Sequence, residues 1–108
     1  MGRYITSTLS YATTTVDTGI SYQAVVNDRV LCSAGAITIT LPAVGDTVVG
    51  DTIQVIDVGG NAGTDAIIVA RNGALIQGAA TDLTIDINNA SPVLVYSGGT
   101  YGWVLTGS

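Results

Sequence analysis

Hydrophobic and polar residues alternate along this chain in short runs, the pattern that indicates β-strands with one buried face. The clearest run is Ala36–Leu41. Its Ile37, Ile39 and Leu41 fall on one face, and threonines occupy the other. Pro42 ends the run because proline has no N–H to donate to a neighbouring strand. Further runs of this kind are Tyr22–Val26, Val30–Ser33, Asp51–Val58, Ala66–Ala70, Ala74–Gln77, Leu83–Ile87, Val93–Ser97 and Gly102–Thr106.

Glycine, asparagine and aspartate separate these runs and predict turns between them. The segment Gly59–Asp65 predicts a hairpin loop, because its three glycines can adopt positive φ. Arg71–Gly73 contains an Asn-Gly pair, which favours a type I′ turn, and Gly98–Thr100 predicts a closing hairpin. No segment has a helical period, and the helix formers Glu and Lys are absent. We therefore expect an all-β fold, a small antiparallel β-sandwich or barrel of the jelly-roll kind.

Residues 1–20 differ from the rest of the chain. They are rich in threonine and serine, with isolated apolar residues and no sustained period. We expect an extended N-terminal arm over 1–20 that adds a strand to a sheet or reaches onto a neighbour. The β-sandwich domain is expected over 21–108.

The composition is unusually apolar. Hydrophobic residues make up 47% of the chain, charged residues 10%, and the mean hydropathy is +0.51, whereas a typical soluble domain carries about 25% charged residues. The charge-free stretch Val30–Gly45 is shorter than the roughly 20 residues that a spanning helix needs, and the N-terminus has no apolar signal segment. We therefore expect no membrane segment, and part of the surface buried against other copies or another protein.

One run carries this apolar excess on both faces. Ala66–Ala70 places Ile67, Ile68 and Val69 in succession, which a sheet with one solvated face would not tolerate. We expect these three residues to form an oligomer interface along a symmetry axis.

The charges and the cysteine exclude further classes of function. The net charge of −5 argues against nucleic-acid binding, which needs clustered Lys and Arg. Cys32 is the single cysteine, so no intrachain disulfide can form. Its apolar neighbours predict a buried, inert thiol.

The residue types present also limit catalysis. The chain has no His and no Glu, so the Ser-His-Asp and Cys-His systems are absent, and one Cys cannot build a zinc site. Asp82 and Asp86 could form a glycosidase pair, and Asp57, Asn61 and Asp65 could supply oxygen ligands to calcium. We favour ordinary turn and surface roles for both groups. We therefore expect a protein that is not an enzyme, with no cofactor, no metal and no small-molecule substrate.

Three aromatic residues of the last two runs allow two interpretations. Tyr96, Tyr101 and Trp103 could form an exposed platform on which sugar rings stack. Alternatively, Tyr96 and Trp103 close the core, as large aromatic residues in a C-terminal strand commonly do. We favour the second interpretation.

Six segments share a recognisable pattern of turns and core residues: Asp57–Thr64, Ala66–Gly73, Ile76–Gly78, Leu83–Ile85, Val93–Gly99 and Trp103–Leu105. With these segments the chain resembles a β-rich module of tailed-bacteriophage virion proteins. The resemblance covers about Tyr22 to Thr106, and it includes both tail-fibre or spike segments and capsid decoration (cement) proteins. It implies a trimeric, all-β virion component and brings no catalytic or ligand residues.

Two functions follow from the resemblance and the composition. The first is a capsid cement protein on the virion surface, which assembles as a homotrimer, binds the major capsid protein and stabilises the shell. The short chain favours this over a fibre, which would carry a long shaft. The alternative is a tail-fibre or spike tip that binds host glycans through the aromatic platform. In the first case the arm contacts the shell or a neighbouring copy through Arg3, Tyr4, Ile5, Leu9 and Tyr11.

Overall fold

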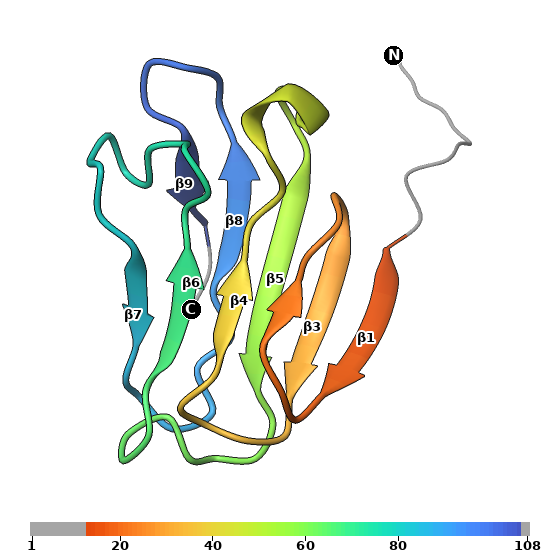
Figure 1. The fold of residues 1–108 in the computed structure, drawn as a ribbon, viewed down its shortest axis with the longest axis vertical. Helices are drawn as coiled ribbons and strands as arrows, with labels where there is room; N and C mark the ends of the chain where they lie inside the picture. The colour runs from red at the N-terminus through yellow and green to blue at the C-terminus, as the bar shows by residue number, and fades with distance from the viewer. Residues whose placement is uncertain (1–12, 107–108) are drawn as a thin grey trace.

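The fold is all-β, as the alternating pattern predicts. The computed structural model describes residues 13–106 (Figure 1). A short 3-10 turn, η1 (Val44–Asp46), is the only helical element in these residues. The strands are β1 (Thr14–Thr18), β2 (Tyr22–Gln23), β3 (Asp28–Cys32), β4 (Thr38–Thr40), β5 (Thr52–Asp57), β6 (Ile67–Ala70), β7 (Leu83–Ile85), β8 (Val93–Tyr96) and β9 (Trp103–Leu105).

The strands form two mixed sheets that face each other. The five-stranded sheet has the order β1-β3-β5-β8-β9, and the four-stranded sheet has the order β2-β4-β6-β7. Along β1 to β6 the chain alternates between the sheets, so each strand returns to its own sheet in the direction of the previous one. β1, β3 and β5 are therefore parallel, as are β2, β4 and β6. This part of the chain winds as a flattened coil, the arrangement of β-helices.

The expectation of an antiparallel fold is correct only for the last three strands. β7 pairs antiparallel with β6, β8 with β5, and β9 with β8. The predicted hairpin at Gly98–Thr100 is thus confirmed, whereas Gly59–Asp65 is not a hairpin loop, because it carries the chain from one sheet to the other. Ala74–Gln77 forms only isolated bridges at Ile76. Asn72 and Gly73 both have positive φ (49° and 87°), as a type I′ turn requires.

One hydrophobic core fills the space between the sheets. Burial alternates along each strand; in β5, Ile53 and Val55 are fully buried while Gln54 between them is partly exposed. Tyr96 and Trp103 close the core, with ring centroids 5.3 Å apart in an edge-to-face arrangement. The preferred interpretation of these two aromatics is confirmed.

The packing of this core contradicts part of the expected oligomer interface. Ile67 and Val69 are fully buried between the sheets of their own protomer. Ile67 and Val69 therefore cannot contact a second copy, and the expected interface role is wrong for both residues. Ile68 points to the outer face of the four-stranded sheet and is partly exposed.

The end of the expected arm is part of the sandwich. β1 lies within 1–20 and pairs in parallel with β3, so this segment does add a strand to a sheet. The expected contact residues of the arm are not among the described residues; they are Arg3, Tyr4, Ile5, Leu9 and Tyr11.

Candidate functional site

The outer face of the five-stranded sheet carries two pairs of aliphatic side chains, separated by the row of Arg29, Gln54 and Val93. Register places Leu31 of β3 beside Ile56 of β5, and Val95 of β8 beside Val104 of β9. All are partly exposed, because their strand neighbours point into the core. With Val93 of β8, these residues define the aliphatic face: Leu31, Ile56, Val93, Val95 and Val104.

The outer face of the four-stranded sheet is different. Ile68 lies between Thr38 of β4 and Thr84 of β7 in the register of this sheet. The next outward row pairs Thr40 with Ala70. Ile68 is thus a single large apolar side chain among threonines. Of the two outer faces, only the aliphatic face has large aliphatic side chains paired across neighbouring strands.

A second apolar surface lies at one end of the sandwich. The loops β2–β3, β4–β5, β6–β7 and β8–β9 all turn at the upper end in Figure 1. These loops expose five large apolar side chains, with exposed fractions between 44% and 71%. We call this surface the apolar end; its residues are Val25, Val44, Val48, Val49 and Tyr101.

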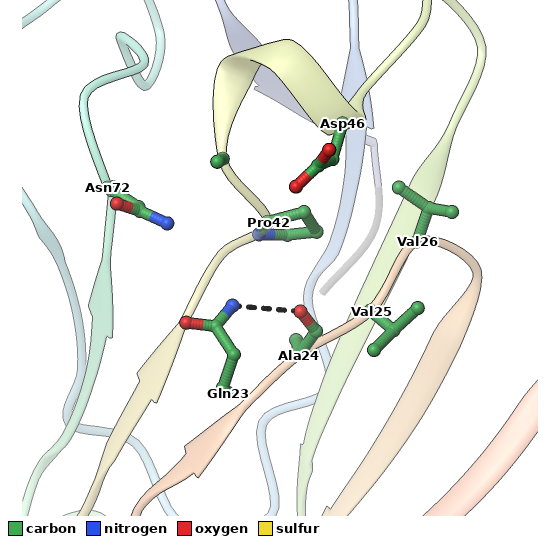
Figure 2. Close-up of a pocket in the computed structure, with 8 residues that line it drawn as sticks. Gln23, Ala24, Val25, Val26, Pro42, Asp46 and Asn72 are labelled. Atoms are coloured by element: carbon green, nitrogen blue, oxygen red, sulfur yellow. Dashed lines mark hydrogen bonds between the residues drawn. The ribbon is translucent and has the colours of Figure 1, made fainter.

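The apolar end also contains a groove of about 350 Å³ (Figure 2). Ala24 and Pro42 are buried in its floor, and Val25 and Val26 form one side. Asp46, on η1, stands above Pro42. The rest of the lining is Gln23, Ala43 and Asn72.

Two side-chain amides fix the shape of this groove. The Nε2 atom of Gln23 donates to the carbonyl oxygens of Ala24 (2.9 Å), Thr40 (3.2 Å) and Leu41 (3.2 Å). The Nδ2 atom of Asn72 donates to the same Leu41 oxygen at 2.9 Å. Since both amides direct their N–H groups to the strand end, their oxygens remain acceptors. Within residues 13–106, neither amide oxygen nor the Asp46 carboxylate accepts a hydrogen bond.

At the opposite end, Asp57 is a structural carboxylate. It is fully buried and accepts hydrogen bonds from the backbone N–H groups of Gly60, Asn61, Ala62 and Asn89 at 3.0–3.3 Å. Burial alone raises the pKa of Asp57, but these four hydrogen bonds outweigh burial and hold the pKa below its ordinary value. Its oxygens are thus engaged with the backbone, which disfavours the calcium interpretation.

The suggested sugar platform is not assembled. Tyr101 is 63% exposed, whereas Tyr96 is 6% exposed and Trp103 is fully buried. Stacking on a sugar needs an exposed aromatic face, so the platform expectation is wrong for Tyr96 and Trp103. Tyr101 remains as a single exposed ring beside Gly78 at the apolar end.

The remaining candidate side chains have local structural roles. Asp82 accepts the backbone N–H of Arg71 at 3.0 Å, and Asp86 is exposed just after β7. Cys32 is buried, as predicted, and burial together with the nearby charge of Asp57 raises the pKa of its thiol to about 11. The thiol is therefore neutral and unreactive near pH 7.

No cluster of three metal-ligating side chains and no helix able to span a membrane occurs in the described part of the chain. Comparison with known proteins found no matching family model and no matching curated protein. Three surfaces remain as candidate sites: the aliphatic face, the apolar end and the groove.

Proposed function

We propose that this chain is a bacteriophage capsid decoration (cement) protein that assembles as a homotrimer on the virion surface. The observation that carries the proposal is the aliphatic face. Five aliphatic side chains from four strands lie on the outside of a sheet whose inner face already forms the core. Aliphatic side chains gathered on one outer sheet face favour contact with another copy or another protein, and the row of Arg29, Gln54 and Val93 lies between the two aliphatic pairs.

The chemistry of the aliphatic face suits a symmetric contact between copies. Each methylene group that the contact removes from water contributes about 0.8 kcal/mol. The face carries only two charges, Arg29 and Asp17, on the neighbouring strands β3 and β1. Their charges are opposite, so Arg29 of one copy can pair with Asp17 of another. Arg29 lies beside Gln54, between the two aliphatic pairs, so this ion pair falls within the contact.

We assign binding of the capsid shell to the apolar end. It bears five of the eight strongly exposed large apolar residues of the described part of the chain. The opposite end bears the other three, Ile20, Val58 and Ile87, together with the acidic residues Asp65 and Asp86. Binding to the assembled shell of the major capsid protein, and not to free subunits, stabilises the shell by mass action. At a free concentration of 100 times Kd this amounts to about 2.7 kcal/mol per site. The tail-fibre alternative loses its main support because Tyr96 and Trp103 are buried.

The test is sedimentation of the purified protein with expanded shells, assembled from the major capsid protein encoded in the same genome. We expect saturable binding and a higher rupture temperature of the decorated shells. Val49→Asp, at the apolar end, should weaken binding at least tenfold, because it places a charge in the contact. Val58→Asp, an exposed valine at the opposite end, is the matched control and should bind normally. Failure to bind shells, together with retention on a glycan array, would contradict the proposal.

A further inference from the structure

We propose that the groove is the docking site of the chain's own N-terminal segment, Met1–Ala12, and that Arg3 binds there beside Asp46. This inference goes beyond the proposed function and concerns the free protein. It depends on three observations: the chemistry of the groove, the distribution of cations in the chain, and the position at which β1 begins.

The groove combines an apolar floor with one acidic acceptor group. Ala24 and Pro42 supply the floor, and Val25 is 59% exposed beside it. The acceptor is the Asp46 carboxylate, which stands above Pro42, whereas the Gln23 and Asn72 amides turn their nitrogen atoms toward the floor (Figure 2). A ligand that complements this surface has an apolar body and a cationic group with several N–H donors. An arginine side chain next to apolar residues has this chemistry, because its guanidinium offers five donors and no acceptor.

The chain supplies one arginine for this role. Its only three cations are Arg3, Arg29 and Arg71. Arg71 donates from Nη1 to the Ala74 carbonyl at 2.9 Å, and Arg29 lies on the outer face of the five-stranded sheet. Arg3 remains, and it is followed by Tyr4 and Ile5, whose apolar side chains suit the floor of the groove. The charge of Arg3 is complementary to that of Asp46.

The N-terminal segment starts close to the groove. The backbone N–H of Thr14 donates to the carbonyl of Asn27 at 3.1 Å, and Asn27 directly follows Val26 in the groove wall. Twelve extended residues span up to about 40 Å, so the segment can pass around the β2–β3 loop. A short tether gives an effective concentration in the millimolar range. The chain's own segment therefore outcompetes that of a second copy at ordinary protein concentrations, and any contact of the arm with a shell requires its release from the groove.

Disulfide cross-linking in the full-length chain tests this docking. Gly2→Cys places a thiol next to Arg3, and Ala43→Cys places one in the groove wall without removing Arg3 or Asp46. The native Cys32 does not compete because it is buried. Under mild oxidation we expect an intramolecular disulfide to form at least ten times faster than in the control pair of Gly2→Cys with Ala80→Cys. Ala80 is an exposed alanine outside the groove lining.

Charge variants of the cross-linking pair make the test specific. Adding Asp46→Lys should slow the reaction to the control rate, and adding Arg3→Asp to that variant should restore it. Equal rates in the groove pair and the control pair would overturn the inference. So would disulfides found only between two copies on a non-reducing gel, since they would assign the groove to a neighbour's segment. Neither result depends on whether the protein binds shells.

Discussion

Asp57→Ala is expected to lower the free energy of unfolding by about 3–5 kcal/mol. The substitution removes the common acceptor of four backbone N–H groups. One of these, the N–H group of Ala62, is buried. These bonds hold the β5–β6 loop against Asn89 in the β7–β8 connection, and Asn89 also donates from Nδ2 to the Asp57 carbonyl at 3.2 Å. Urea unfolding followed by the fluorescence of Trp103, the single tryptophan, measures the effect. Asp65→Ala, in the same loop but exposed, is the matched control and should change stability by less than about 0.5 kcal/mol.

The same carboxylate predicts how stability depends on pH. The pKa of Asp57 is lowered in the folded protein, whereas an unfolded aspartate titrates near pH 3.9. The unfolded state therefore takes up a proton first as the pH falls. The contribution of Asp57 is complete above about pH 4 and is lost as the pH falls through its folded-state pKa. Asp57→Asn should show a weaker loss of stability in acid than the native chain. Parallel pH profiles for the two proteins would contradict this role.

Gly102→Ala is expected to destabilise the protein by about 2–4 kcal/mol. Gly102 has φ of +71°, a conformation that costs any residue with a Cβ atom, and an added Cβ would collide with the backbone of Leu75. The neighbouring contacts leave little room to move. The Gly102 N–H donates to the Gly98 carbonyl, and its carbonyl accepts from the N–H and hydroxyl of Ser97.

Gly99→Ala is the matched control for this substitution. Gly99 lies in the same β8–β9 loop, has no positive φ, and has open space where a Cβ would be added. Its replacement should leave the urea midpoint within experimental error of the native chain. If the two variants were equally stable, the close approach of Gly102 to Leu75 would not constrain the loop.

The positions of most strands could be predicted from the sequence, but their pairing could not. Alternation of apolar and polar residues, as in Ile37, Ile39 and Leu41, shows which side of a strand is buried and is the same for parallel and antiparallel neighbours. The Gly59–Asp65 segment has the composition of a hairpin loop, yet it connects strands of different sheets. Whether a glycine-rich connection returns to the same sheet depends on tertiary packing, which a local pattern does not contain.

The candidate surfaces, too, could be predicted from the sequence only in part. A strand that is apolar on both faces indicates an apolar outer surface. β8 has this pattern as strongly as β6, because Val93 and Val95 lie outside and Leu94 and Tyr96 lie inside. Only the register shows that Val95 of β8 lies beside Val104 of β9 while Ile68 lies among threonines. The groove could not have been predicted, because three segments far apart in the sequence build it.

The most direct test of the account is the solution mass of the purified protein, measured by light scattering beside Ile56→Asp and Ile68→Asp. Both substitutions put a carboxylate at a partly exposed isoleucine on an outer sheet face. We expect the native chain and Ile68→Asp to have the mass of a trimer, and Ile56→Asp, on the aliphatic face, to be monomeric. A native protein that is a soluble monomer, or a trimer that Ile68→Asp dissociates and Ile56→Asp does not, would contradict assembly through the aliphatic face.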